Sequence, residues 1–162
     1  IVRKKLICKR NFTENLQVTD PCYDKDVWCR LDLKIKSGKY SCYIWKQKIK
    51  SSTLTYYYEV GIIGMYLNSK NGNCVIPDVR TRELAGYIGV DAGLAGFFND
   101  KPDFTGEQWH NLCDFISAHH NDMFYKIKEG VFADSGYGDG EYPVYVYRNN
   151  ANEITGVEIQ FL

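Results

Sequence analysis

Alternation of apolar and polar side chains with a period of two constrains the fold more than any other feature of this sequence. Residues 31–36, Leu-Asp-Leu-Lys-Ile-Lys, alternate strictly, and residues 154–161 place Val157 and Ile159 on one side and Glu158 on the other. Successive side chains of a strand point to opposite faces, so this pattern is typical of a sheet with one buried face. The sequence therefore predicts a mainly β protein of the α+β class, either an antiparallel β-sandwich or a barrel-like sheet.

Turn-forming residues separate the predicted strands. Ser37-Gly38-Lys39 predicts a hairpin between residues 31–35 and 40–49, and residues 149–152 predict a second hairpin near the C-terminus. Asn71-Gly72 is a further turn signal. The remaining strands are expected at residues 6–8, 16–19, 56–67, 74–76, 87–90, 130–133 and 143–148.

One helix is expected, at about residues 105–120. Thr105 is a suitable N-cap residue, and an apolar face follows at helical spacing, made of Trp109, Leu112, Cys113 and Ile116. The 162 residues contain no internal repeat and no linker. We therefore expect residues 1–162 to form a single domain.

The charges exclude a globally basic protein, because 20 basic and 20 acidic side chains cancel. A local basic patch is predicted on the hairpin of residues 31–49, where aromatic residues accompany the lysines and would suit a nucleic acid or a nucleotide. The alternative is a solvated edge whose lysines prevent unwanted strand pairing. The zero net charge favours that alternative, so we expect no nucleic-acid partner. The lysines of the patch are Lys34, Lys36, Lys39, Lys46 and Lys48, followed by Lys50.

Six cysteines form no C-x-x-C pair, so no metal site based on sulfur is predicted. Reduced thiols in a cytoplasmic protein are the expected state. An even cysteine count and one Asn11-Phe12-Thr13 sequon leave disulfides and secretion open as the alternative. No stretch approaches the roughly 18 apolar residues that span a bilayer, so no membrane association is expected.

The densest group of polar side chains lies among glycines in residues 130–147. We predict a tight hairpin there, whose glycines permit a sharp turn or the close approach of a ligand. Two other aspartates are predicted at strand ends, Asp20 before Pro21 and Asp91 before Ala92-Gly93. Each could instead only stabilise a turn. The candidate ligand-binding residues are Asp20, Tyr23, Asp91, Asp134, Ser135, Tyr137 and Asp139.

Three segments resemble elements of a bacterial and phage domain family of unknown function. They are Asp20-Pro21-Cys22-Tyr23, Asp91-Ala92-Gly93 and the run Ser-Gly-Tyr-Gly-Asp-Gly at residues 135–140. In that family a D-P-C-Y element, a D-[AS]-G element and an S-G-Y-G-D-G element occur in this order. The resemblance spans roughly residues 16–161 and implies that the three elements act as a unit. It implies no activity and no catalytic residue.

Three functions are compatible with these observations. The first, which we expect, is a non-catalytic binding domain with a protein partner, such as an immunity-type or phage anti-defence protein. The second is a binder of a small polar or nucleotide-derived ligand. The third is a metal-assisted hydrolase using Asp20, Asp91 and Asp139, provided that the fold brings them together. The sequence contains no known catalytic motif, and it assigns no catalytic residue, metal ligand or cofactor.

Overall fold

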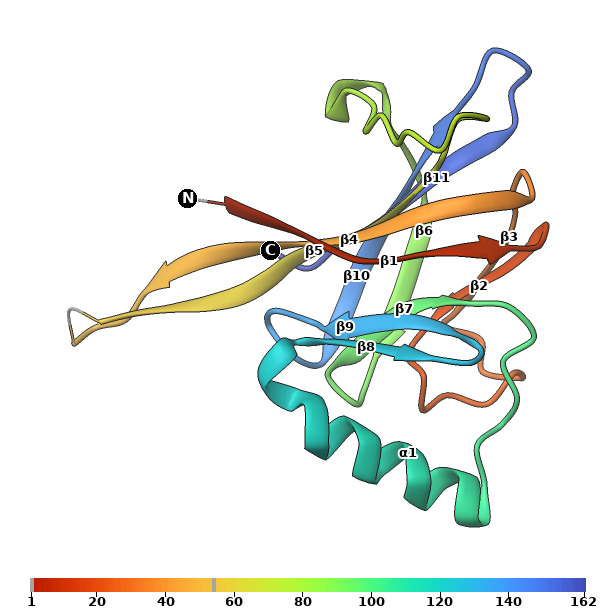
Figure 1. Cartoon of the computed structure of the whole chain (residues 1–162). Coiled ribbons are helices and arrows are strands. Elements are labelled where there is room, and N and C mark those ends of the chain that lie inside the picture. The colour runs from red at the N-terminus through yellow and green to blue at the C-terminus, as the bar shows by residue number, and fades with distance from the viewer. Residues whose placement is uncertain (1, 54) are drawn as a thin grey trace.

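Two antiparallel β-sheets pack face to face in the computed structural model, which describes residues 2–53 and 55–162 (Figure 1). The six-stranded sheet has the order β1 (Val2–Phe12), β4 (Gly38–Lys50), β5 (Tyr56–Leu67), β11 (Ile154–Gln160), β10 (Gly140–Arg148), β6 (Glu83–Val90). The five-stranded sheet has the order β3 (Leu31–Lys34), β2 (Asn15–Thr19), β7 (Leu94–Phe98), β9 (Gly130–Asp134), β8 (Phe124–Ile127). The predicted antiparallel β-sandwich is confirmed.

The core lies between the two sheets and follows the predicted alternation. Ile44 and Ile63 of one sheet and Leu16 and Phe97 of the other are fully buried. Each such side chain contributes about 1.5–3 kcal/mol to the free energy of folding. Val157, Ile159 and Phe161 also lie in this core, as the pattern of residues 154–161 predicts.

Helix α1 (Gly106–His119) covers the outer face of the five-stranded sheet and continues into a 3₁₀ turn, η2 (His120–Asp122) (Figure 1). The predicted helix and its N-cap position at Thr105 are confirmed, although the Thr105 side chain makes no capping hydrogen bond. The buried side of the helix differs from the prediction, because Trp109 is 36% exposed. The helix instead packs through Leu112, Phe115 and Ile116 against a second apolar cluster that contains Leu94, Phe98, Tyr125 and Phe132.

The predicted hairpin of residues 31–49 is wrong, because its two strands belong to different sheets. β3 pairs with β2, whereas β4 pairs with β1 and β5. Between them the chain crosses from one sheet to the other, and Ile35 is buried at the crossing. The Ile35 N–H bonds to the Glu14 carbonyl and the Lys36 N–H to the Ile154 carbonyl. Alternation specifies which face of a strand is buried and leaves the pairing partner open.

The glycine run is also a crossing between the sheets, so the tight hairpin predicted for residues 130–147 is wrong. β9 is flanked on both sides, by β7 and β8 of the five-stranded sheet. β10 pairs with β11 and β6 of the other sheet. The predicted hairpin around residues 149–152 is confirmed, and it inserts β10 and β11 between β5 and β6.

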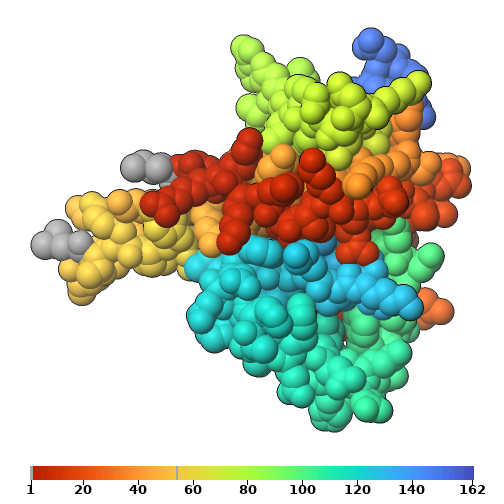
Figure 2. Space-filling model, in the orientation of Figure 1, coloured from red at the N-terminus to blue at the C-terminus, as the bar shows by residue number. Residues whose placement is uncertain are grey.

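Residues 68–82 form no strand, contrary to the prediction for 74–76, and contain only a short 3₁₀ helix, η1 (Val79–Thr81). The end of the β4–β5 hairpin projects from the body of the molecule, at the left in Figures 1 and 2. β8 was not predicted, and β1 is much longer than residues 6–8. Within the described residues, no helix is long and apolar enough to cross a membrane.

Candidate functional site

The three predicted sequence elements meet in the fold. One carboxylate oxygen of Asp20 accepts hydrogen bonds from the backbone N–H groups of Asp91 (2.9 Å) and Ala92 (2.7 Å). The other accepts a hydrogen bond from the Cys22 N–H at 2.8 Å. The Gly93 carbonyl in turn accepts a bond from the Ser135 N–H at 2.9 Å. Asp20 therefore joins the first element to the second, and Gly93 joins the second to the third.

One glycine of the second element and one of the third form the turns at this junction. Gly93 and Gly138 have φ angles of 68° and 88°, in the left-handed region that favours glycine. A Cβ atom on Gly93 would lie 4.0 Å from the Gly138 Cα. The Gly138 carbonyl accepts hydrogen bonds from the hydroxyls of Ser135 (2.5 Å) and Tyr142 (2.7 Å), which fix the turn.

These contacts give Asp20 a role in the backbone structure. Asp20 is fully buried, and both of its oxygens bond to backbone N–H groups. Asp91, Tyr137 and Asp139 are exposed on the surface beside it. Among the residues described, no group of three or more His, Cys, Asp or Glu side chains is positioned to hold a metal ion. The convergence thus builds a rigid surface with one buried carboxylate beneath it.

Two further candidate residues, Tyr23 and Asp134, lie in other surroundings. Tyr23 is half-buried beside Cys29, and burial, followed by hydrogen bonding with Cys29, raises the pKa of its phenol. The Asp134 carboxylate accepts a hydrogen bond from the Tyr125 hydroxyl at 2.9 Å. Burial raises the pKa of Asp134, and the Tyr125 bond opposes this. Ser135, as described above, is used within its own turn.

The predicted basic patch is divided into two separate groups by the crossing at Ile35. Lys34 and Lys36 lie near the carboxylates of Glu14 (3.9 Å) and Glu153 (3.4 Å). Lys46 and Lys48 lie on the other half of β4, toward the projecting end of the β4–β5 hairpin. A single patch made of Lys34, Lys36, Lys39, Lys46 and Lys48 is therefore not formed.

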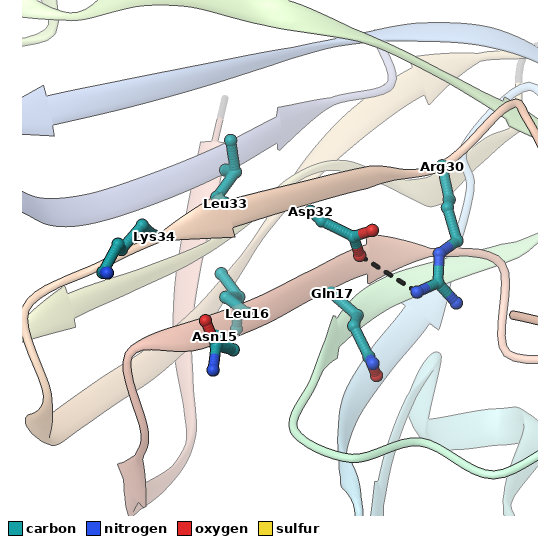
Figure 3. Close-up of a pocket in the computed structure, with 7 residues that line it drawn as sticks. All are labelled: Asn15, Leu16, Gln17, Arg30, Asp32, Leu33 and Lys34. Carbon is teal, nitrogen blue, oxygen red and sulfur yellow. Dashed lines mark hydrogen bonds and ion pairs between the residues drawn. The ribbon is translucent and has the colours of Figure 1, made fainter.

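A polar pocket of about 370 Å³ lies beside Lys34, on the β2–β3 edge (Figure 3). Leu16 and Leu33 point away from its polar side chains, and Arg30 pairs with Asp32 at 3.0 Å. The pocket is lined by Asn15, Leu16, Gln17, Arg30, Asp32, Leu33 and Lys34. Arg30 bonds to Asp32 through Nη2 only; its Nη1 is buried and has no hydrogen-bond partner among the described residues, so the ion pair leaves this side chain partly unsatisfied.

Sequence reasoning missed an exposed aromatic surface on the outer side of β6 and β10. Three of its members are unusually exposed for large apolar residues: Trp28 is 91%, Tyr87 51% and Leu84 50% exposed, whereas Pro143 and Tyr145 are half-buried. Tyr87 lies opposite Pro143, and Leu84 lies opposite Tyr145. A bulge at Ala85 places Leu84 on the same side as Tyr87, away from the core. We call this surface the aromatic face; it consists of Trp28, Leu84, Tyr87, Pro143 and Tyr145.

The loop of residues 20–30 holds Trp28 in place beside β6. The Lys101 ammonium group is buried and donates hydrogen bonds to the carbonyls of Tyr23 (2.7 Å) and Pro102 (3.0 Å). The Gly89 N–H bonds to the Cys29 carbonyl at 2.8 Å. Trp28 and Tyr87 line a hollow of about 150 Å³ together with Cys29, Ile88, Gly89 and Glu141. The sequence contains one signal for this surface. Tyr87 alternates with the buried Ile88, so Tyr87 was predictable as a residue on the outer face of its strand.

A buried charged cluster adjoins the aromatic face on the outer side of the six-stranded sheet. Glu158 lies opposite Tyr145, and the Arg82 guanidinium lies 3.8 Å from the centre of the Tyr145 ring. Glu158 faces outward as predicted, yet it is only 4% exposed. Its carboxylate accepts hydrogen bonds from the hydroxyls of Tyr66 and Tyr147 and pairs with Arg82 at 2.9 Å. Burial, followed by the Glu158 charge, raises the pKa of the Tyr66 phenol. The cluster attaches the end of segment 68–82 to the sheet.

Comparison of the chain with protein-family models, with curated proteins and with solved structures gave no match.

Proposed function

We propose that this chain is a non-catalytic binding domain that recognises a protein partner through the aromatic face. The observation that carries this proposal is the 91% exposure of Trp28 beside the half-exposed Tyr87. Tryptophan and tyrosine are the residues that most often dominate the energy of protein interfaces. An exposed indole contributes little to folding, whereas a partner that covers it gains a large apolar contact.

The edge of β6 supports a partner in extended conformation. β6 is the last strand of its sheet and pairs with β10 on one side. At one end of this edge the Gly89 N–H is already bonded to the Cys29 carbonyl, so an added strand would pair with the remaining part, toward Glu83. Backbone donors and acceptors of an edge bind an added strand, while side-chain pockets next to it provide selectivity. The hollow between Trp28 and Tyr87 is the side-chain pocket available here.

The hollow favours a basic side chain of the partner. Glu141 contributes a carboxylate to it, and two aromatic rings attract a cation through their faces. Its volume of about 150 Å³ is below the roughly 300 Å³ of ordinary small-molecule pockets, which suits one side chain better than a whole ligand. We therefore propose a Lys or Arg anchor in an extended segment of the partner.

This mode of action suits an immunity-type or anti-defence protein. Such a protein acts by occupying a surface of its partner, and it requires no catalytic group. The saturation of the Asp20 carboxylate by backbone N–H groups makes the alternative of a hydrolase based on Asp20, Asp91 and Asp139 less favourable.

The test is a selection of extended peptides from a displayed random library on the intact protein, followed by titration of the selected peptides. Trp28→Ala should weaken binding by about 30-fold or more, the effect of losing a 2 kcal/mol contact. Trp109→Ala, a partly exposed tryptophan on α1, should not change the affinity. Glu141→Gln should weaken only peptides that contain Lys or Arg. Selected peptides that bind Trp28→Ala with unchanged affinity would refute the proposal.

A second candidate function, binding of a single-stranded nucleic acid, is favoured by the projecting β4–β5 ribbon. Strand register places five cations on one face of β1 and β4 there: Arg3, Lys5, Lys46, Lys48 and Lys50. In the described part of the chain, none of them lies within 4 Å of a carboxylate. Burial, followed by repulsion from Lys5, lowers the pKa of Lys46, and the charges of Asp122 and Asp134 partly oppose this.

Tyrosines accompany these cations, as a stacking surface for bases requires. The Arg3 guanidinium lies 4.7 Å from the centre of the Tyr58 ring, and the Lys48 ammonium lies 4.1 Å from that of Tyr56. Cations along a backbone path with aromatic rings between them are typical of surfaces that bind single strands. The five cations of the ribbon thus form a local basic patch, although the net charge of the protein is zero.

A gel-retardation assay with a single-stranded oligonucleotide tests this candidate. The triple variant Arg3→Gln, Lys48→Gln, Lys50→Gln should lose binding, and the dependence on salt should become weaker as phosphate contacts are removed. The matched control removes three charges elsewhere, Lys34→Gln, Lys36→Gln, Lys39→Gln, and should still bind. Failure of the unmodified protein to retard the oligonucleotide would end this candidate.

A further inference from the structure

We propose that Cys8 and Cys42 form a redox-active dithiol, which low-molecular-weight disulfides oxidise to an intramolecular disulfide. The two residues face each other across the pairing of β1 with β4. Both sulfur atoms belong to free thiols in the structure. The site is separate from the aromatic face and does not depend on the proposed binding function.

The backbone geometry fits a disulfide. Cys8 and Cys42 are direct Cα partners, and a bulge between Leu6 and Cys8 sets this register. Opposite residues of antiparallel strands have Cα atoms about 4.5–5.5 Å apart, within the range that a disulfide spans. Cys42 lies in the core, and Cys8 packs against that core from the same side of the sheet. The bond can therefore form without a rearrangement of the strands.

The two thiols differ in the way that an attacking and a resolving cysteine differ. Cys8 is partly exposed, whereas Cys42 is fully buried. Hydrogen bonding with the Cys42 thiol lowers the pKa of Cys8 to about 7, and the charges of Arg10 and Lys126 add to this against the effect of burial. The pKa of Cys42 is raised, first by the hydrogen bond with Cys8 and then by burial. An accessible thiolate next to a protonated partner is typical of a redox-sensing pair.

The positive charges around Cys8 are held in place by the fold. Arg10 lies on the same strand, and its guanidinium donates hydrogen bonds to the carbonyls of Ile127 (2.8 Å), Lys128 (2.6 Å) and Gly130 (3.0 Å). Lys126 approaches from β8, which contacts β1 at this edge of the sandwich. Cys8 therefore has cations on two elements, β1 and β8, and a thiol on a third, β4.

The reaction proceeds in two exchange steps. The Cys8 thiolate attacks one sulfur of the small disulfide, forms a mixed disulfide and releases one small thiolate. The Cys42 thiol then loses its proton to the released thiolate and attacks the Cys8 sulfur, which releases the second small thiolate, protonated from solvent. Two protein thiols are oxidised, and one small disulfide is reduced to two small thiols. A reducing thiol pool reverses both steps.

The surroundings of two other cysteines, Cys22 and Cys74, favour reaction at the Cys8–Cys42 pair instead. Burial, followed by the charge of Asp20, raises the pKa of Cys22 to about 12. Its thiol therefore remains protonated at neutral pH and is a poor nucleophile. Cys74 bonds weakly to the Tyr66 carbonyl beneath segment 68–82, at 4.0 Å.

The first test exposes the folded protein to glutathione disulfide, followed by acid quenching, alkylation and mass mapping of peptides without reduction. The expected product links the peptides of Cys8 and Cys42. Cys42→Ala should instead accumulate a mixed disulfide on Cys8, and Cys74→Ala should still form the internal bond. Circular dichroism confirms that each variant is folded. The proposal is overturned if Cys8 and Cys42 both remain reduced, whether or not other cysteines react.

The second test follows the alkylation of Cys8 by iodoacetamide against pH. Half-maximal reactivity is expected near pH 7 in the unmodified protein, at the pKa of Cys8. Both Cys42→Ala, which removes the hydrogen bond, and Lys126→Gln, which removes a facing charge, should move this midpoint to higher pH. A midpoint near the ordinary cysteine value of about 8.5 in the unmodified folded protein would contradict the proposed site.

Discussion

The buried carboxylate of Asp20 accepts a 2.9 Å hydrogen bond from the backbone N–H of Asp91, which follows strand β6. Together with the bonds from Ala92 and Cys22, this contact fastens the end of one sheet to a strand end of the other. Because the Asp20 carboxylate is buried and charged, its three hydrogen bonds to backbone N–H groups stabilise the turns after β2 and β6 more than bonds from a solvent-exposed side chain would.

Replacement of Asp20 by asparagine should therefore destabilise the fold strongly. The amide NH₂ group cannot accept a hydrogen bond, so at least one buried backbone N–H, of Asp91, Ala92 or Cys22, would face another donor. We expect a loss of about 3 kcal/mol in the free energy of unfolding, measured by urea denaturation. Asp91→Asn, at an exposed side chain, is the control and should change stability by less than about 0.5 kcal/mol. Equal effects of the two substitutions would contradict the role of Asp20.

The Glu158 cluster should depend on charge in the same way. Glu158→Gln removes the buried ion pair with Arg82 and replaces one of the two acceptor oxygens by an NH₂ donor, which then faces either Arg82 or the two tyrosine hydroxyls. We expect a loss of about 3 kcal/mol in the free energy of unfolding. The exposed pair of Glu83 with Arg148 offers the matched control, because Glu83→Gln should cost less than about 1 kcal/mol. If Glu158→Gln lowered the free energy of unfolding by as little as Glu83→Gln, the cluster would contribute little to stability.

Stability should fall at alkaline pH because the fold keeps the Tyr66 phenol protonated. Burial and the Glu158 charge raise the pKa of Tyr66 in the native state, while in the unfolded chain the phenol ionises near pH 10. Below that pH this contribution to stability is fully present. As the pH rises above it, the unfolded state binds fewer protons, and the free energy of unfolding falls by about 1.4 kcal/mol per pH unit for such a group.

Urea denaturation at a series of pH values from about 8 to 11 measures this slope around the tyrosine pKa. Tyr66→Phe should make the alkaline decline shallower by about one proton. The exposed Tyr137 supplies the control, and Tyr137→Phe should keep the original slope. An unchanged slope in Tyr66→Phe would disprove the assignment.

Trp28 should dominate the fluorescence that an aqueous quencher reaches. It is 91% exposed, Trp109 is 36% exposed, and Trp45 packs near the rings of Tyr43 and Tyr66. Trp28→Phe should remove most of the iodide-quenchable emission and shift the remaining maximum to shorter wavelength. Trp109→Phe should have the smaller effect. If the order is reversed, the loop of residues 20–30 does not present Trp28 to solvent.

The sequence predicted the strands better than it predicted their partners. The alternation of residues 31–36 and 154–161 and the helical spacing around Leu112 report on burial, which is a local property of each segment. The assignment of β3 and β4 to different sheets depends on where Ile35 is buried, and this is decided by strands distant in sequence. Local turn signals such as Ser37-Gly38 are satisfied by a crossing as well as by a hairpin.

The candidate site was predictable in part. The resemblance implied that Asp20, Asp91 and residues 135–140 act as a unit, and contacts among these segments are present in the fold. The aromatic face was not foreseen, because it requires the register of β6 against β10 and the bulge at Ala85. Exposure of Trp28 likewise depends on the Lys101 bonds that fix its loop.

The insertion of β10 and β11 between β5 and β6 has a consequence for biosynthesis. The six-stranded sheet cannot close while the ribosome is still making residues 140–160, because two of its interior strands, β10 and β11, are synthesised after the other four. Until then β5 and β6 each lack a neighbour, and their apolar edges are open to other chains. Pairings over such long sequence distances also form slowly. The sheet is therefore expected to close only after residue 160 has been synthesised, and chains truncated before residue 140 are expected to aggregate.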